Sequence, residues 1–251
     1  ICMLEVNKTY NLSWQEGLPQ IDDNSIDLII IDPPYLTTHQ KWDKDEVVNE
    51  ELSQQLLRIA KDSCSLYIWC GIGEKSQSLI RWFPIFSKNW YFKDLITWKK
   101  QRGIGMRKGW LYTREEIMWF VKDNKQFVWN LDAQYSTEKY DALWAKRLKK
   151  EDFPYKRATN VWTDIKEETL LGLCGAKDEQ KKNILHFTPK PLKALERIIK
   201  CHTKENDLIL DCFAGSGSTG VAAKSLNRNF ILIEKESRYC EICNQRLNAS
   251  S

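Results

Sequence analysis

The sequence lacks an apolar run long enough to form a membrane-spanning helix, which takes about 20 predominantly apolar residues. Its richest run, Ile26–Ile31, is interrupted by Asp27 and followed at once by Asp32. A leader with a basic start, an apolar centre and a small-residue end is also missing. No internal repeat or low-complexity segment is present. We therefore expect neither a membrane protein nor a secreted one.

Regular cysteine spacing is missing too, although the 251 residues include eight cysteines. A disulfide framework is therefore not expected, and a reducing, intracellular compartment is the better interpretation. One close pair exists, Cys240 and Cys243, with Cys201 and His202 as further conceivable ligands. No second close pair completes a four-ligand zinc site, and a spacing of three on a helix simply places two small residues on one face. We expect no metal.

Hydrophobic residues (42%) and charged residues (29%) are present in the proportions of a folded globular protein. The net charge of +4 is uneven: Lys99 to Arg157 holds 15 basic and 8 acidic residues, an excess of +7 that leaves −3 for the rest. Many aromatic residues lie in the same stretch. Such a mixture suits a surface that touches phosphates and bases, or a solvated face over an aromatic core, and composition leaves both open. The candidate nucleic-acid-binding residues are Arg102, Arg107, Lys108, Lys149 and Lys150.

Strand-like and helix-like runs alternate at both ends of the chain. Runs that are apolar on both faces, with helices between them, predict a doubly wound α/β fold with a mostly parallel sheet. The middle, about residues 99–185, is polar and irregular and predicts an insert. The predicted strands are Asp27–Asp32, Cys64–Cys70, Tyr91–Trp98, Glu115–Val121, Asp207–Cys212 and Asn229–Glu234. The predicted helices are Glu46–Lys61, Pro189–His202, Ser218–Leu226 and Ser237–Leu247.

A glycine-rich turn follows one of these strands and opens a helix. Gly215, Gly217 and Gly220 have the spacing GxGxxG, and Glu234 ends the next strand 19 residues after Gly215. Glycines let the backbone turn tightly and approach a ligand, and an acid at the end of the next strand can bind a ribose diol. The pattern predicts a site for an adenosine-containing cofactor, NAD included.

A second motif, Asp32-Pro33-Pro34-Tyr35, directly follows the strand Leu28–Ile31. The two prolines end the strand's hydrogen bonding and stiffen the loop, which should lie at the carboxyl edge of the sheet, where open α/β folds bind ligands. The Asp32 carboxylate and the proline carbonyls can accept from an exocyclic amine. Tyr35 offers a ring on which a base taken out of its helix can stack.

Together the two motifs resemble the S-adenosylmethionine-dependent DNA amino-methyltransferases of restriction-modification systems and bacterial epigenetic regulation. The order, with DPPY before FAGSGSTG and a basic insert between them, is similar to the permuted arrangement called the β class. Further similar segments are Asn24–Leu28, Trp42-Asp43, Asn160-Val161-Trp162 and His186–Pro191. The resemblance implies a circularly permuted, seven-stranded, mostly parallel sheet. It divides the chain into a catalytic half (1–98), the end of the catalytic sheet with a target-recognition insert (99–185) and a cofactor-binding half (186–251).

The resemblance also implies site residues. Asp32 and the Pro33 carbonyl would hold the target amine, with Pro34 in the same rigid loop and Tyr35 stacked on the base. Thr188 and Lys190 would close over the amino-acid portion of S-adenosylmethionine. Ser13 stands where the family usually has an aspartate near the cofactor adenine. The remaining cofactor-binding candidates are Asp211, Phe213, Ala214, Gly215, Gly217 and, for the ribose, Glu234.

Several alternatives stay open on sequence alone. The family's N4-cytosine members more often carry serine where this chain has Asp32, which favours N6 of adenine over N4 of cytosine. RNA could replace DNA as the substrate. The rival classes are an NAD-dependent oxidoreductase and a non-catalytic, nucleic-acid-binding partner of an active subunit. Relatives often pair, so a homodimer is a candidate assembly. A Pro-Cys nucleophile for methylating a ring carbon of cytosine is absent.

Overall fold

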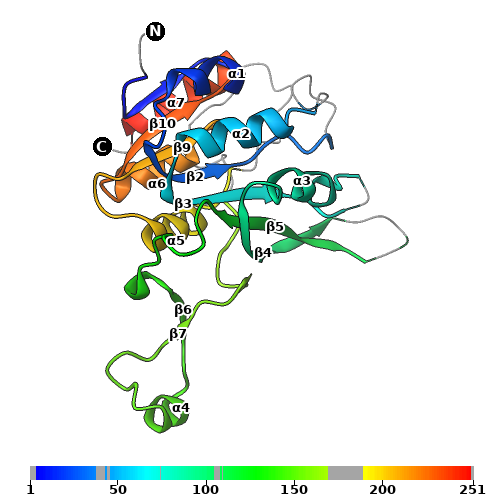
Figure 1. Cartoon of the computed structure of the whole chain (residues 1–251). Coiled ribbons are helices and arrows are strands. Elements are labelled where there is room, and N and C mark those ends of the chain that lie inside the picture. The colour runs from blue at the N-terminus through cyan, green and yellow to red at the C-terminus, as the bar shows by residue number, and fades with distance from the viewer. Residues whose placement is uncertain are drawn as a thin grey trace.

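Helices cover both faces of a central, mostly parallel sheet in the computed structural model (Figure 1). The structure describes residues 4–37, 43, 46–73, 75–104, 108, 110–168 and 189–249. Within them the sheet has eight strands in the order β1-β10-β9-β2-β3-β5-β4-β8. Their bounds are β1 (Lys8–Tyr10), β2 (Ile26–Ile31), β3 (Ala60–Cys70), β4 (Tyr91–Ile104), β5 (Tyr112–Val121), β8 (Val161–Trp162), β9 (Leu208–Asp211) and β10 (Asn229–Ile233).

The strand directions confirm the predicted fold class. The pairs from β1 through β10, β9 and β2 to β3 are parallel, whereas β5 runs antiparallel to both β3 and β4. Seven strands were predicted from the resemblance. The eighth is β8, two residues from the end of the insert that pair in parallel with β4.

Both faces of the sheet are apolar because its strands are buried on both sides. In β2, Ile29 and Ile31 join one core, while Leu28 and Ile30 join the other, as the two-residue period of a strand requires. The helices that contribute to the first core are α1 (Trp14–Gly17), α2 (Glu50–Ile59) and α3 (Ser78–Phe86). Those that contribute to the second are α5 (Leu192–His202), α6 (Ser218–Ser225) and α7 (Ser237–Ala249).

Several predicted boundaries differ from the structure. Helix α2 begins only at Glu50 because Asn49 caps it, its side chain accepting from the Leu52 amide at 2.9 Å. Strand β3 begins at Ala60, directly after that helix, instead of at Cys64. Helix α3 was not predicted, and Pro84 within it hides the helical period from a sequence reading.

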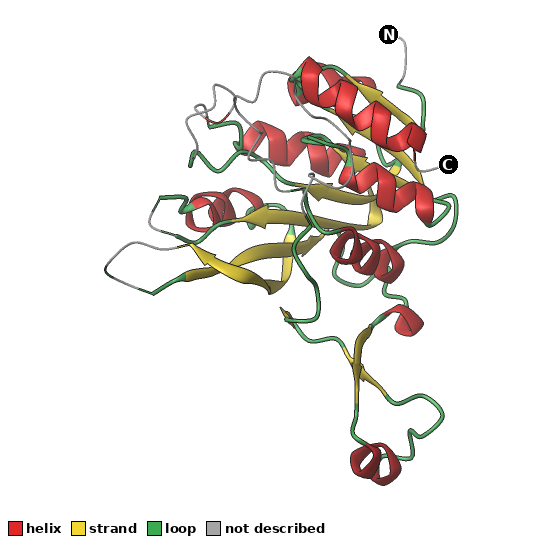
Figure 2. Ribbon diagram, turned by 180° about the vertical axis from the view of Figure 1, so that it is seen from behind, coloured by secondary structure: helices red, strands yellow, loops and turns green. Residues whose placement is uncertain are grey.

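The basic insert divides into a hairpin and a projecting arm. Strand β4 continues to Ile104 and pairs with β5, so this part of the insert extends the main sheet. Residues 131–157, here called the arm, then extend away from the sheet in both views (Figures 1 and 2). The arm consists of η3 (Leu131–Ala133), β6 (Tyr135–Lys139), α4 (Ala142–Arg147) and β7 (Tyr155–Arg157).

Helix α5 anchors both ends of the arm. Before it, the Asn130 amide group donates to the carbonyls of Lys200 and Thr203 at 2.8 and 2.9 Å. After it, Asp164 forms an ion pair with Arg197. The chain segments before and after the arm are therefore both held at α5, and the arm extends from the fold between them.

The aromatic residues of the insert have two different environments. Trp119 and Trp129 pack around the buried ring of His202, each 5.2 Å from it between ring centroids. Trp110 in the β4–β5 connection and Trp144 on the arm are exposed. Part of the insert therefore covers an aromatic core, and another part leaves aromatic rings exposed.

The histidine in this cluster is neutral. His202 Nδ1 lies 2.7 Å from the Val128 carbonyl and therefore carries the proton, so Nε2 accepts from the Tyr67 hydroxyl at 2.7 Å. Burial lowers the pKa of His202 to about 4.

Cys240 and Cys243, the pair that is close in sequence, lie on α7, where both residues are buried. Cys243 Sγ is 3.2 Å from the Thr9 hydroxyl. Cys201 Sγ contacts the Ala133 carbonyl. Among the described residues, no group of three or more His, Cys, Asp or Glu side chains could hold a metal ion. Within the same ranges, no helix is long and apolar enough to cross a membrane.

Protonation of His202 should destabilise the fold in acid. Its folded pKa lies below the usual 6.5, so its contribution to stability is present above pH 6.5 and is lost as the pH falls through about 4. We expect the wild type to lose on the order of 3 kcal/mol more unfolding free energy over that range than His202→Gln does. Urea unfolding of both proteins between pH 7 and 4 measures this difference. Parallel pH profiles would contradict the assignment of a neutral buried imidazole.

Candidate active site

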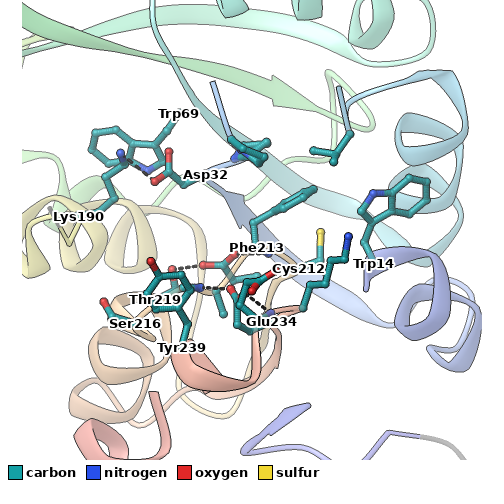
Figure 3. Close-up of a pocket in the computed structure, with 18 of the residues that line it drawn as sticks. Trp14, Asp32, Trp69, Lys190, Cys212, Phe213, Ser216, Thr219, Glu234 and Tyr239 are labelled. Carbon is teal, nitrogen blue, oxygen red and sulfur yellow. Dashed lines mark hydrogen bonds and ion pairs between the residues drawn. The ribbon is translucent and has the colours of Figure 1, made fainter. Parts of the chain in front are cut away.

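A cavity of about 510 Å³ opens at the carboxyl ends of the central strands. Figure 3 shows Asp32, Lys190 and Trp69 grouped in one part of it, and Phe213, Thr219 and Glu234 in another. The first group surrounds the end of β2, and the second surrounds the turn after β9. Because β2 and β9 are neighbouring parallel strands, the two sequence motifs meet in one cavity.

The glycine turn needs its glycines for two reasons. Gly215 and Gly217 have φ angles of 50° and 78°, which side chains disfavour. A Cβ at Gly217 would lie 2.3 Å from Cys243 Sγ, so the turn could not rest against α7 with any other residue there. Gly217 does not line the cavity. It shapes the turn that does.

Two buried charged side chains hold this turn in place. The Gly215 amide donates to Glu234 at 2.7 Å, and the Glu236 amide donates to the same carboxylate at 2.8 Å. On the other side, the guanidinium of Arg246 donates to the carbonyl and the hydroxyl of Ser216 at 2.8 and 2.7 Å. Glu234 thus ties β10 to the turn, and Arg246 ties α7 to it.

Asp211, at the end of β9, is a buried acid whose bonds do not offset its desolvation. Its carboxylate accepts from the Thr219 hydroxyl at 2.6 Å and from the Phe213 amide at 3.0 Å. Burial nevertheless raises the pKa of Asp211 to about 7, and it also raises the pKa of Glu234. This part of the cavity therefore favours a cationic ligand, which would stabilise both carboxylates.

The loop from Asp32 to Tyr35 is fixed beyond its two prolines. The Tyr35 hydroxyl donates to Asp32 Oδ1 at 2.7 Å. The next two amides, of Leu36 and Thr37, donate to the carboxylate of Asp43 at 2.7 and 2.8 Å. Asp43 stabilises the left-handed backbone of Leu36, whose φ is 62°. The resemblance had marked Asp43 only as part of a Trp-Asp pair.

Lys190 lies beside the loop from Asp32 to Tyr35. Its ammonium is 2.9 Å from Asp32 Oδ2 and 3.1 Å from Glu115 Oε2, and Lys100 pairs with the same Glu115. The ring centroid of Trp69 is 5.0 Å from this ammonium. Burial alone would lower the pKa of Lys190, but the two carboxylates overcome it and raise that pKa above its usual value. Lys190 is therefore a permanent cation.

Most sequence-predicted site residues line this cavity. Ser13 does so while capping α1: its hydroxyl accepts from the Glu16 amide, and the Glu16 side chain accepts from its amide. Thr188 lies outside the described residues. The other predicted residues that line the cavity are Asp32, Pro33, Pro34, Tyr35, Lys190, Asp211, Phe213, Ala214, Gly215 and Glu234. The role assigned to each stays a prediction.

The predicted nucleic-acid-binding residues whose side chains the structure describes do not line the cavity. Lys108 is exposed in the β4–β5 connection, and Lys149 and Lys150 follow α4 on the arm. Arg107 lies outside the described residues, as does the side chain of Arg102.

Sequence analysis missed Glu115, Trp69 and Tyr239, which also line the cavity. Glu115 and Trp69 belong to predicted strands, and nothing in their spacing tells which strand ends reach the site. The pairing of β3 and β5 with their neighbours in the sheet determines that these residues reach the site.

The ionisation of Asp211 should weaken the ligand-free fold. Because its folded pKa lies above the usual 3.8, its contribution is present below pH 3.8 and is lost as the pH rises through about 7. We expect Asp211→Asn to gain up to about 4 kcal/mol in unfolding free energy relative to the wild type at pH 8, and little at pH 4. Denaturant titrations at both pH values test this, with Asp22→Asn as the exposed control. An equal change at both pH values would refute the raised pKa.

Comparison with known proteins agrees with this geometry. A family model described as DNA methylase matches residues 26–245. The chain is 32% identical over 266 residues to the Type II methyltransferase M1.MboII of Moraxella bovis, covering 98% of both chains. It is 30% identical over 249 residues to the DNA adenine methyltransferase YhdJ of Escherichia coli, covering 93% of this chain and 80% of YhdJ.

Solved structures share the fold. The M1.HpyAVI–SAM complex superposes with a TM-score of 0.62 at 24% identity and covers 96% of this chain and 99% of that one. The cytosine-N4-specific PvuII DNA methyltransferase superposes with a TM-score of 0.67 at 15% identity and covers 97% and 87%. The matched residues include the catalytic loop and the glycine turn, and the chain belongs to the β-class family of S-adenosylmethionine-dependent DNA amino-methyltransferases.

Proposed function

We propose that the chain transfers the methyl group of S-adenosylmethionine to the exocyclic N6 of an adenine that has been flipped out of a DNA duplex. One observation carries this proposal: Asp32 lines the same cavity as the glycine turn and its two neighbouring acids, Asp211 and Glu234. An acceptor for an amine and a site for a cation are thus adjacent. The name of YhdJ as a DNA adenine methyltransferase supports adenine as the base. So does an aspartate, instead of serine, at position 32.

The residues present fit the cofactor. S-adenosylmethionine is cationic at its sulfonium and ammonium groups, and Asp211 is a buried carboxylate whose raised pKa a nearby cation would lower. Asp211 and Phe213 would hold the amino-acid portion, and Glu234 would accept from the ribose hydroxyls. When bound, the cofactor supplies an activated methyl group on a positively charged sulfur.

Asp32 would prepare the amine for attack. The lone pair of an exocyclic amine is delocalised into its ring, so the nitrogen is a poor nucleophile. Hydrogen bonds from the two N–H groups to Asp32 and to the Pro33 carbonyl would favour a pyramidal nitrogen with an available lone pair. The Asp32 carboxylate has room for this bond, because a carboxylate offers about four acceptor sites and, of the residues that the structure describes, only Tyr35 and Lys190 bond to it through their side chains.

The target base must leave the helix to reach Asp32, and Tyr35 would stack on it there. The Tyr35 ring is already fixed at its edge by Trp82, at 5.9 Å between centroids, and by its hydroxyl on Asp32. A fixed ring costs little entropy when a base stacks on it.

The arm would contact the DNA backbone. Four cations lie within five positions at and after the end of α4: Lys146, Arg147, Lys149 and Lys150. The guanidinium of Arg147 lies 5.0 Å from the Trp144 ring centroid, and the Lys150 ammonium lies 5.7 Å from the Tyr140 centroid. Cations beside aromatic rings, of which Trp144 is exposed, suit a surface that meets both phosphates and bases.

Asp32→Asn should abolish methyl transfer while it preserves cofactor affinity, because Asp32 would touch the amine instead of the cofactor. We expect a fall of at least about 100-fold in rate, of the size seen when one group that stabilises developing charge is removed. Unmethylated genomic DNA with labelled cofactor, followed by nucleoside analysis, measures the product, and calorimetry measures cofactor affinity. Asp22→Asn is the exposed control.

The same assay decides between the bases. N4-methylcytosine as the product would replace adenine by cytosine in the proposal. Near wild-type methylation by Asp32→Asn would remove Asp32 from its role.

Charge reversal on the arm should weaken DNA binding and leave cofactor binding intact. For Lys149→Glu with Lys150→Glu we expect weaker binding and a shallower dependence of affinity on salt, since fewer counterions are released. Fluorescence anisotropy between 50 and 200 mM salt, concentrations at which such effects are large, measures both. The control reverses Lys88 and Lys204, two exposed lysines outside the arm. If both double variants behave alike, the arm is not the contact surface.

A further inference from the structure

Lys190 is bound in a way that a cofactor contact would not require. Its ammonium is shared between Asp32 and Glu115, at 2.9 and 3.1 Å, and its side chain is only 13% exposed. These two bonds use two of its three N–H groups. No further hydrogen bond to Lys190 is found among the described residues. Lys190 also lines the cavity, so one donor of a buried cation remains for a ligand beside Asp32.

Base edges carry their donors and acceptors in two opposite orders. In adenine and in cytosine, an amine that donates lies next to a ring nitrogen that accepts. In guanine and thymine, a carbonyl that accepts lies next to a ring N–H that donates. A protein that presents an acceptor beside a donor therefore matches the first pair of bases and mismatches the second. Asp32 and Lys190 present such a pair, with their charged atoms 2.9 Å apart.

We propose that Lys190 donates a hydrogen bond to the ring nitrogen beside the target amine, which is N1 when the base is adenine. This inference rests on the proposed function and adds the second half of base recognition to it. Asp32 accepts from the amine and Lys190 donates to its neighbour, so the two side chains read the amino-base edge together. Guanine and thymine would place an acceptor against Asp32 and a donor against Lys190.

The surroundings of Lys190 hold it ready for this contact. Glu115 is itself buried and paired with Lys100, so it cannot easily follow the ammonium out of the site. The rings of Trp69 and Tyr35 lie 5.0 and 5.5 Å from the ammonium and limit its movement. A donor that is oriented before the base arrives loses little entropy on binding.

The test is a double-mutant cycle in which one change is the substitution of Lys190 and the other is the replacement of one atom of the target base. The duplex carries the target motif, first read from the methylated positions in genomic DNA, with either adenine or 1-deazaadenine at the target. 1-Deazaadenine keeps the amine but has C–H in place of N1. For the wild type we expect single-turnover methylation to be about 10- to 100-fold slower on 1-deazaadenine, the size of a lost charged hydrogen bond. For Lys190→Met we expect a similar loss on adenine and little further loss on 1-deazaadenine.

The ratio of the two rates is what distinguishes a base contact from a structural role. Easier flipping or altered amine reactivity of 1-deazaadenine affects both enzymes alike and cancels in the comparison. Lys100→Met is the matched control, because it removes the other lysine on Glu115 and should keep the wild-type ratio. If Lys190→Met does not bind cofactor, Lys190→Arg takes its place, and its shifted donor should reduce the ratio.

Two failures are distinguishable. A wild-type enzyme that methylates adenine but does not discriminate against 1-deazaadenine overturns the Lys190 contact and leaves the proposed function standing. The contact is also overturned, with the proposed function left standing, if Lys190→Met slows methylation of adenine and of 1-deazaadenine by the same factor relative to the wild type. A wild-type enzyme that methylates no adenine at all, with cofactor bound, removes the proposed function and this inference with it.

Discussion

The pairing of β2 with β9 brings together two segments that lie 181 residues apart in the chain. Leu28 and Ile29 pair with Ile209 and Leu210, and the Asp27 carboxylate accepts from the Leu208 amide at 2.9 Å while it pairs with Lys61 on β3. This contact sets where both strands end. The loop from Asp32 to Tyr35 and the glycine turn follow those ends, so the distances between them in the cavity depend on this register. A shift by one residue would turn Asp32 to the opposite face of the sheet.

The site combines groups that stabilise the fold with groups that cost stability. Arg246 and the amides bonded to Glu234 fix the glycine turn. Asp211, in contrast, is buried, and within the described ranges its hydrogen-bond donors are the neutral Thr219 hydroxyl and Phe213 amide; its raised pKa reflects that cost. Strain of this kind is common where a protein is shaped for a ligand before the ligand arrives. Asp211 accepts only from neutral donors among the described residues, whereas the Lys190 ammonium is paired with two carboxylates, so the two parts of the cavity differ in their electrostatics.

Sequence analysis recovered the fold class and the two motifs, and most of the site residues that it predicted line the cavity, because local rules determine them. Apolar runs such as Leu28–Ile31 and the glycine spacing after β9 are readable without a structure. It did not recover β1, which is three residues long, or α3, whose period Pro84 interrupts. Nor did it place Lys190 beside Asp32: a lysine side chain can reach in several directions, and only the neighbouring strands bring Glu115 there to hold it. Strand positions follow from pattern, whereas ion-pair partners follow from tertiary packing.

The two anchors on α5 have a consequence for how such enzymes diversify. Between Asn130 and Asp164 the chain leaves the sheet and returns to the same helix, so the intervening segment can change in length or composition while its ends stay fixed. Doubling the length of such a loop costs only about 0.6 kcal/mol in closure entropy. An ancestral enzyme could therefore acquire a different recognition module by insertion or recombination at these two points, and its progeny would inherit the methyl-transfer chemistry unchanged.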